Sequence, residues 1–536
     1  MQEIKDALQK ASKAEFELDL QAELTRPDEK FGDYSSNIAM QLGKKTAKNP
    51  REIAILLAAK LHGLSAVDKV EVAGSGFINI KLTDEKVADA AQKATDLGKP
   101  LAGQEIVLEH TDPNPFKEFH IGHTYSNTVG IAIGNLLKTA GANVHQVTYQ
   151  GDVGLHIAMA IYGLKNPDNK EDLGLSYAFG AEAYEHDPLA KEQIETINLH
   201  LYKRDDPQIN ELYDRGRKRS LEKFEQIYQK LGADFEKNYF ESDTAKEGIE
   251  IVKKNIGKTF VESEEAIIYD GEKAGLHKRV FITKKGLPTY EAKEIGLAFA
   301  KNRDYPAAQK FIVITANEID DYFNVLVAAI KEIEPTLAAK IMHLSHGVVK
   351  FPGGKMSSRT GNVKTFDELF GELEIKANQL YGEGKGVPGT VLGAIKYEFL
   401  KHRIGSDFVF DVEESISLQG NSGPYLQYAH ARASSILKKS DSPAAYQPTS
   451  FEPAERSLAR KISEYPEVVQ TATKELLPSH ITTYLYELAQ NFNSFYETSR
   501  IIGDVRQDLR LKLVRSYSDV LASGLGLLNI AAPDHM

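Results

Sequence analysis

Strand-like and helix-like segments alternate through the middle of the chain. Residues 106–108 are a short apolar run of the kind that forms a buried parallel strand. Residues 124–140 contain no proline, and Gly141 follows them as a helix stop. A second strand is predicted over residues 144–149. This order predicts a strand–helix–strand unit whose helix begins where the first strand ends.

The two ends of the chain have different patterns from the middle. Residues 50–61 are helix-like, and residues 70–82 alternate apolar and polar side chains after Phe77, as a half-buried strand does. A small α+β domain is therefore expected over residues 1–100. Residues 376–536 are helical with few breaks, which predicts an all-α bundle.

The remaining stretch, residues 101–375, has the pattern of a parallel α/β domain. A charged helical segment at about 160–257 interrupts it and is predicted to be an insertion. Further strands of the same sheet are expected at residues 266–269, 279–282, 311–314 and 347–351.

Composition fits an ordinary globular chain with several domains. Its 536 residues are too many for one core, and 42% are hydrophobic and 26% charged. No apolar run approaches the roughly 18 residues of a membrane span. There is no cysteine, which excludes disulfides and thiolate zinc sites and is compatible with the reducing cytoplasm where we expect the protein.

The formal net charge of −11 argues mildly against a nucleic-acid partner, although a local basic face can coexist with it. The basic cluster Arg215-Gly216-Arg217-Lys218-Arg219 has two interpretations. It is either a solvated helix face or a contact with a nucleic-acid backbone.

The turn His120-Ile121-Gly122-His123 lies between the first predicted strand and its helix. Free N–H groups and the helix dipole at such a position attract anions, so we expect ATP here. Gly122 would let the adenosine approach the backbone, where a Cβ would block it. His120 and His123 would donate hydrogen bonds to phosphate oxygens as negative charge develops.

A glycine-bounded loop carries the second set of candidate residues, Lys355, Met356, Ser357 and Arg359. Lys355 and Arg359 are cations suited to holding a leaving pyrophosphate. An exposed basic loop would be the simpler interpretation of this segment alone. The histidine turn in the same chain favours a phosphate site.

Together, the histidine turn and the loop Lys355-Met356-Ser357-Ser358-Arg359 resemble the paired signatures of class I aminoacyl-tRNA synthetases. The finer resemblance, over nearly the whole chain, is to the arginyl-tRNA synthetase family. It includes the residues around Asn114, the stretch 32–37 and the helical tail. It implies a Rossmann-type catalytic domain, a tRNA-elbow-binding domain before it and an anticodon-binding bundle after it.

The resemblance also implies site residues and partners. L-arginine would contact Glu109, Asn114, Tyr290 and Glu294, and Lys117 would act with the histidines on the phosphates. ATP would bind at His120, Gly122, His123, Lys355, Met356 and Ser357. Phe77, Asn79 and Tyr484 would contact tRNA(Arg). Magnesium is expected only with ATP, because no carboxylate cluster marks a dedicated metal site, and we expect a monomer.

Three positions depart from the family pattern. Ser358 stands where the loop signature usually has a second lysine, a role that Lys117 is expected to take. Glu294 stands where an aspartate is typical, so its carboxylate reaches one methylene further. The segment 315–321 differs from the family's usual one, so no role is transferred to it.

Three other functions fit the sequence less well. A cysteinyl-tRNA synthetase would need zinc thiolates, which a chain without cysteine cannot supply. A small nucleotidylyltransferase would leave both flanking domains unexplained. A non-catalytic tRNA-binding paralogue would be expected to lack the histidines or the basic loop, and this chain has both.

Overall fold

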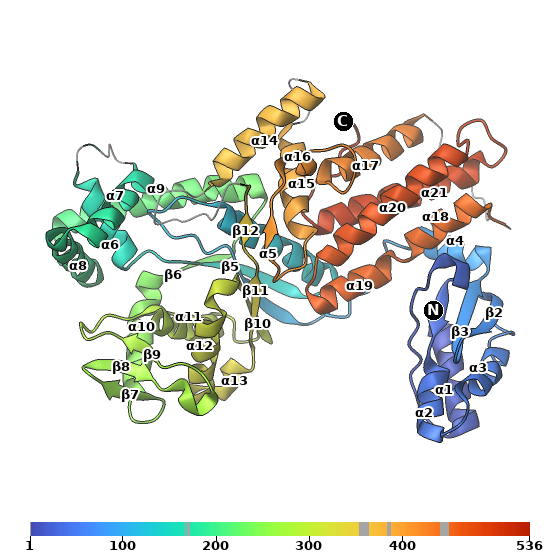
Figure 1. Ribbon diagram of the computed structural model, residues 1–536, viewed down its shortest axis with the longest axis horizontal. Coiled ribbons are helices and arrows are strands. Elements are labelled where there is room, and N and C mark those ends of the chain that lie inside the picture. Colours follow the sequence, from blue (N-terminus) through green and yellow to red (C-terminus); the bar gives the residue numbers. More distant parts are fainter. Residues whose placement is uncertain (1, 167, 169–171, 353–363, 383–386, 440–449) are drawn as a thin grey trace.

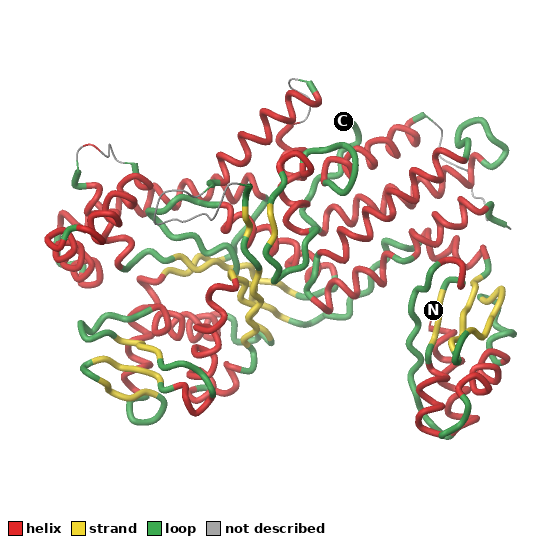
Figure 2. The backbone as a smooth tube through the Cα atoms, in the orientation of Figure 1, coloured by secondary structure: helices red, strands yellow, loops and turns green. Residues whose placement is uncertain are grey.

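The structure is a computed structural model that describes residues 2–166, 168, 172–352, 364–382, 387–439 and 450–536. A small N-terminal part, a central sheet with helices around it and a helical C-terminal part follow one another along the chain (Figure 1). Strands gather in the first two parts, whereas the third is nearly all helix (Figure 2). Within the described ranges, no helix is both long and apolar enough to cross a membrane.

The N-terminal part combines helices with a three-stranded antiparallel sheet in the order β1-β3-β2. In β3, Ile78, Ile80 and Leu82 are buried and Phe77 and Lys81 are exposed, as the predicted alternation requires, but Asn79 between them is buried too. The elements are α1 (Gln2–Phe16), η1 (Glu29–Phe31), β1 (Tyr34–Ser36), α2 (Ile38–Thr46), α3 (Pro50–Ala59), β2 (Val67–Ala73), β3 (Phe77–Leu82) and α4 (Asp84–Gln92).

The central sheet has five parallel strands in the order β11-β10-β4-β5-β6. In sequence order, β4 comes first and lies in the middle of the sheet, β5 and β6 follow on one side of it, and β10 and β11 then lie on the other side. The order reverses between β4 and β10, and ligands of open α/β sheets bind at such a switch point. The strands are β4 (Glu105–Glu109), β5 (Asn143–Gln150), β6 (Lys237–Phe240), β10 (Lys310–Ala316) and β11 (Ile341–His346).

Helices cover both faces of this sheet. Ile106 and Leu108 of β4 join the core that includes α5 (Ile121–Thr139), whereas Val107 joins a second core on the other face. Burial on both faces explains why this strand is continuously apolar. The second core includes residues of α10 (Glu241–Lys254), α11 (Tyr290–Asp304), α12 (Asp320–Ile333) and α13 (Pro335–Ala338), with η4 (Asn317–Ile319) before α12.

The helices between β5 and β6 have a core of their own, which includes Ile157, Ile161 and Ile194. They are α6 (Leu155–Leu164), α7 (Leu173–His186), α8 (Pro188–Lys203) and α9 (Pro207–Leu231). The segment predicted to be helical is therefore helical over most of its described length. Its one departure is β6, which is an edge strand of the parallel sheet.

Three of the four further strands predicted for this sheet lie elsewhere. The segments 266–269 and 279–282 are β8 (Ala266–Tyr269) and β9 (Arg279–Ile282), which form a separate antiparallel sheet with β7 (Phe260–Ser263). A short 3-10 helix, η3 (Gly271–Ala274), joins them. The segment 347–351 contains β12 (Val349–Lys350), which pairs with β13 (Phe408–Val409) instead. An apolar pattern indicates that a strand is buried, but it does not specify which other strand it pairs with.

The C-terminal part is a helical bundle, as predicted. α17, α18, α20 and α21 pack on one another, and α19 contacts α5 of the central part. The helices are α14 (Phe366–Tyr381), α15 (Val387–Leu400), α16 (Val412–Ser415), α17 (Gly423–Lys438), α18 (Pro453–Ser463), α19 (Tyr465–Glu475), α20 (Ser479–Thr498) and α21 (Gln507–Leu527). The predicted α/β class with two flanking domains of these types is confirmed.

Candidate functional site

A cavity of about 540 Å³ lies where β4 and β10 end, at the switch point of the sheet. The N-terminal ends of α5 and α11 also border it. Residues predicted for arginine and for ATP line this one cavity, although they are far apart in the sequence. They are Glu109, Asn114, His120, Gly122, His123, Tyr290 and Glu294.

The two histidines cap the first turn of α5. The Nδ1 atom of His120 accepts a hydrogen bond from the Gly122 N–H at 3.1 Å, and the Nδ1 of His123 accepts one from the His120 N–H at 3.2 Å. Their rings stack with centroids 3.7 Å apart. A Cβ added to Gly122 would lie 3.0 Å from the His120 ring, so the close approach of that ring favours glycine here.

Burial lowers the pKa of His120 to about 4 and holds the pKa of His123 well below its ordinary value. Both rings are therefore neutral at pH 7. Because each Nδ1 accepts a hydrogen bond, the proton of each ring lies on Nε2. The pair can thus offer two Nε2–H donors to an anion without adding net charge to the cavity.

The basic loop residues Lys355, Met356, Ser357 and Arg359 lie outside the described residues. The chain directly after them contacts the histidine turn. The Ile121 N–H donates to the Lys364 carbonyl at 3.0 Å, and the Phe366 N–H donates to the Phe119 carbonyl at 3.1 Å. Residues 364–366, which directly follow the basic loop in the sequence, are therefore hydrogen-bonded to the histidine turn.

Two buried lysine–glutamate pairs stand at the wall of the cavity. Lys301 pairs with Glu109, and Lys293 pairs with Glu241. All four side chains are almost completely buried, and both lysines come from α11. Such pairs hold α11 against β4 and α10, since breaking a buried pair leaves an uncompensated charge.

Glu294 and Asp112, which also line the cavity, form no ion pair with a lysine or arginine among the residues that the structure describes, although the charge of Lys301 acts on both. Burial, reinforced by the nearby Glu109 carboxylate, raises the pKa of Glu294 to about 8. The Tyr322 hydroxyl donates a hydrogen bond to it. Burial and Glu109 also raise the pKa of Asp112 well above its ordinary value, although the Tyr149 N–H donates to Asp112 at 2.7 Å.

The lining as a whole is acidic. Among the described residues of this lining, Arg279 is the one basic residue of the lysine or arginine type, and its Nη1 lies 3.4 Å from the Glu291 carboxylate. A cationic ligand with several donors, such as a guanidinium group, fits this lining. The carboxyl groups are those of Glu109, Asp112, Glu241, Glu291, Glu294 and Glu318.

Lys117 lines an adjoining cavity of about 970 Å³, which also reaches Tyr290. The Lys117 Nζ lies 4.7 Å from the centroid of the Tyr177 ring. This second cavity lies between the inserted helices and the start of α11, and Lys284 and Lys285 also line it. The structure therefore places Lys117 beside the histidine cavity and not among the residues that line it.

The residues predicted to contact tRNA have different environments. Phe77 is 42% exposed, whereas Asn79 is only 8% exposed and accepts a hydrogen bond from the Ser35 hydroxyl at 2.8 Å. Tyr484 is only 3% exposed, and its hydroxyl donates to the Lys461 carbonyl at 3.0 Å. Its ring is stacked on Tyr465, and the Lys461 Nζ lies 5.2 Å from the ring centroid, so this buried tyrosine is not available to stack on an RNA base.

Sequence reasoning missed Lys301, Asp112 and Tyr322. Lys301 follows Glu294 by seven residues in α11, a spacing that places both on one helix face and could have suggested a shared site. The atypical segment 315–321 also lines the cavity, through Thr315, Ala316, Glu318 and Ile319.

The basic cluster at 215–219 lies on α9, and part of it turns inward. The Arg217 Nε lies 2.8 Å from the buried Asp152 carboxylate, which also accepts from the Tyr213 and Ser242 hydroxyls. Arg215, Lys218 and Arg219 are exposed. Arg217 is therefore a structural residue that joins α9 to the end of β5.

Comparisons with known proteins agree on one family. The model described as tRNA synthetases class I (R), catalytic domain, matches residues 87–412, the arginyl tRNA synthetase N-terminal domain matches 1–82, and the DALR anticodon binding domain matches 426–536. An arginine–tRNA ligase of Lactobacillus delbrueckii subsp. bulgaricus is 30% identical over 561 residues, which cover 97% of this chain and 96% of the relative. That of Limosilactobacillus fermentum is 30% identical over 572 residues, covering 100% and 99%. The solved Thermus thermophilus arginyl-tRNA synthetase has a TM-score of 0.83 at 26% identity, with 100% of both chains covered. The chain therefore belongs to the arginyl-tRNA synthetase family.

Proposed function

We propose that the protein is an arginine–tRNA ligase. In the first step, the arginine carboxylate attacks the α-phosphorus of ATP, which forms arginyl-adenylate and releases pyrophosphate. In the second step, a hydroxyl of the 3′-terminal adenosine of tRNA(Arg) takes the arginyl group and releases AMP. The observation that most supports this proposal is the meeting of the histidine turn and an acidic cavity at the switch point of the sheet.

In the first step, the neutral rings of His120 and His123 donate their Nε2–H groups to phosphate oxygens of ATP. These bonds strengthen as charge develops on the oxygens during transfer. Lys355 and Arg359 hold the pyrophosphate, and Met356 and Ser357 contact ATP. Magnesium enters with ATP as part of the substrate. Positioning and charge stabilisation carry most of the acceleration.

Arginine is selected by the acidic half of the cavity. Its guanidinium binds the Glu294 carboxylate, which loses its proton as the cation enters. The Tyr290 hydroxyl and the Asn114 amide provide further hydrogen bonds. Glu109 adds negative charge that it shares with Lys301. A site built from such groups rejects analogues that lack the matching donors.

For the second step, we place the tRNA 3′ end in the adjoining cavity, where Lys117 and Tyr290 meet. Lys117 there reaches toward the phosphates from the side of the inserted helices. The proposed division of labour assigns residues 1–100 to the tRNA elbow, with Phe77 and Asn79 in contact, and residues 101–375 to catalysis. Residues 376–536 bind the anticodon arm.

Charging of total tRNA with each of the twenty amino acids tests the proposal. We expect labelled product with arginine alone. The variant His123→Ala should charge about 100-fold more slowly, since one oriented donor to a developing charge contributes about that much. Charging with a different amino acid, or undiminished charging by the variant, would contradict the proposal.

We propose further that the protein acts as a monomer in the cytoplasm. Size-exclusion chromatography with light scattering tests the first part. A mass of about twice the 59.4 kDa of the chain would contradict it.

A further inference from the structure

The stretch 32–37, which resembles part of the family's tRNA-elbow-binding domain, contains an acidic residue that faces the helical bundle. Asp33 is only 1% exposed. Its two carboxylate oxygens accept hydrogen bonds from the Arg456 guanidinium at 3.1 and 2.7 Å, and the second also accepts from the Leu82 N–H at 2.7 Å. Arg456 lies on α18, so this pair joins the first part of the chain to the last.

A second ion pair joins the same two parts with the charges reversed. The Arg26 Nε donates to the Glu467 carboxylate of α19 at 2.9 Å, and the Tyr34 hydroxyl donates to the same carboxylate at 2.5 Å. The Arg26 guanidinium also lies over the Tyr34 ring, 3.9 Å from its centroid. We call Asp33, Arg456, Arg26 and Glu467 the Asp33 latch.

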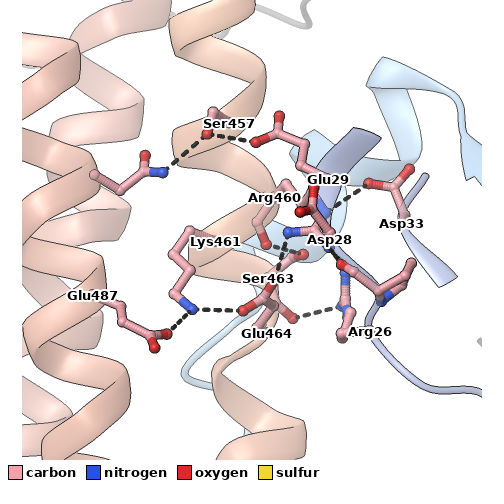
Figure 3. Close-up of polar contacts among 12 residues, drawn as sticks. Arg26, Asp28, Glu29, Asp33, Ser457, Arg460, Lys461, Ser463, Glu464 and Glu487 are labelled. Atoms are coloured by element: carbon pink, nitrogen blue, oxygen red, sulfur yellow. Dashed lines mark hydrogen bonds and ion pairs between the residues drawn. The ribbon is translucent and has the colours of Figure 1, made fainter. Parts of the chain in front are cut away.

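Further hydrogen bonds surround the latch. Arg460 of α18 donates to the Pro27 carbonyl at 2.6 Å, and the Ser457 hydroxyl donates to the Glu29 carboxylate at 2.9 Å. Figure 3 shows these surrounding contacts, in which the segment with Arg26, Glu29 and Asp33 faces Ser457 and Arg460 of α18 and Glu464 between α18 and α19. Two ion pairs of opposite polarity favour this relative orientation, because exchanging their positions would place like charges together and other orientations would break both pairs.

The latch lies beside the surface proposed for RNA. Asn79 and Lys81 line a polar cavity of about 280 Å³ together with Asp33, Arg456 and Arg460. Phe77, Asn79 and Lys81 alternate along β3, so they lie on one face of the sheet. The face proposed to bind the tRNA elbow is therefore next to the helices of the anticodon-binding bundle.

We propose that the four latch residues are positioning residues for tRNA. They hold the elbow-binding face at a fixed orientation to the helical bundle, so that both parts bind one tRNA simultaneously. The inference rests on the proposed function. When two sites on one ligand are held in the correct geometry, binding at the first gives the second a high effective concentration, and loosening the connection lowers it.

The test uses the full chain with Glu467→Gln and Arg456→Lys combined, which keeps the side-chain sizes similar and removes the forked and charged pairing. We expect the KM for tRNA to rise about tenfold, while kcat and the KM for arginine change less than about twofold. The control is Asp89→Asn, because Asp89 also forms an ion pair, at 2.6 Å, but its partner Lys93 belongs to the same N-terminal part of the chain. Unchanged KM for tRNA in the folded double variant would overturn the inference.

A double-mutant cycle separates positioning from general stability. In the wild type, Phe77→Ala should raise the KM for tRNA, because the elbow contact is lost. In the latch variant the same change should have less effect, because that contact is already uncoupled. Fully additive effects would contradict the inference.

A distance measurement between the N-terminal part and the helical bundle tests the inference independently of activity. The chain has no cysteine, so spin labels can be attached at the exposed positions Lys45→Cys and Glu497→Cys. The wild type should give one narrow distance distribution and the latch variant a broad one. A narrow distribution in both would overturn the inference. A wild type that charges no tRNA with arginine would instead refute the proposed function.

Discussion

The acidic cavity and the Asp33 latch surround their carboxylates differently: Asp33 is only 1% exposed, whereas Glu294 is half-buried in the cavity wall. Asp33 accepts two guanidinium hydrogen bonds and one from a backbone N–H. Glu294 forms no direct ion pair with a lysine or arginine in the described part of the chain, and burial raises its pKa to about 8 although the Lys301 charge lowers it. A buried charge without a counter-charge is unfavourable, so the fully paired carboxylate stabilises the assembly of the protein and the unpaired one is suited to a cationic ligand.

The largest effect should come from Glu294→Gln, which removes the carboxyl group that can ionise for arginine without changing the shape of the side chain. We expect kcat/KM for arginine to fall about 1,000-fold, or roughly 4 kcal/mol, because the guanidinium loses a buried charge partner. Steady-state charging kinetics measure this, with the KM for ATP as the internal control. A loss below tenfold would mean that Glu294 does not select arginine.

Arg456→Met should have a smaller effect, which lowers the free energy of unfolding and not the kcat/KM for arginine. This change removes both guanidinium hydrogen bonds from the buried Asp33, leaves it only the more distant Arg460 at 3.6 Å, and should destabilise the protein by about 3 kcal/mol. Urea unfolding of both proteins measures the difference. The exposed-pair variant Asp89→Asn should stay within about 0.5 kcal/mol of the wild type. Equal losses in the two variants would remove the distinction between buried and exposed pairs.

The smallest effect is a pH dependence of arginine binding. Glu294 is protonated in the free cavity below about pH 8, whereas the proposed arginine site needs its ionised form. Affinity should therefore rise about tenfold per pH unit between about pH 6 and 8 and then level off. Titrations with Glu294→Gln should lose this slope. A flat wild-type profile would contradict the proposed proton release.

The same pKa shift has a consequence for stability, with the opposite sign. The folded-state pKa of about 8 lies above the ordinary value of 4.5, so the folded protein holds a proton that the unfolded chain releases. Stability from this group is therefore present at low pH and is lost as the pH rises from about 4.5 to 8.

Local patterns predicted the centre of the molecule well. The apolar run at 106–108, the glycine after the helix and the histidines at its start together specified β4, α5 and β5, because these contacts are close in sequence. β11 (Ile341–His346) was missed, because His343 and His346 interrupt its apolar residues. In the structure its residues are mostly half-buried, without the alternation that marks a half-buried strand. β8 and β9 were predicted as strands but assigned to the wrong sheet, since strand pairing is a long-range property.

The site was predicted where a motif identified the residue and missed where a distant partner completed it. Glu109 was expected to face arginine, but its pairing with Lys301 links positions 192 residues apart. Tyr484 was predicted to contact RNA, because helical spacing cannot distinguish a core tyrosine from an exposed one. Its burial follows from the packing of α20 against α18 and α19.

Calorimetric titration of arginine at pH 7 into the wild type and Glu294→Gln tests the central claim most directly. Repeating each titration in two buffers of different ionisation enthalpy counts the protons released. We predict that the wild type releases close to one proton on binding arginine, as a group with a pKa of about 8 must when it ionises. The variant should bind far more weakly and release none. Equal affinity of the two proteins, with no proton released by either, would contradict the account.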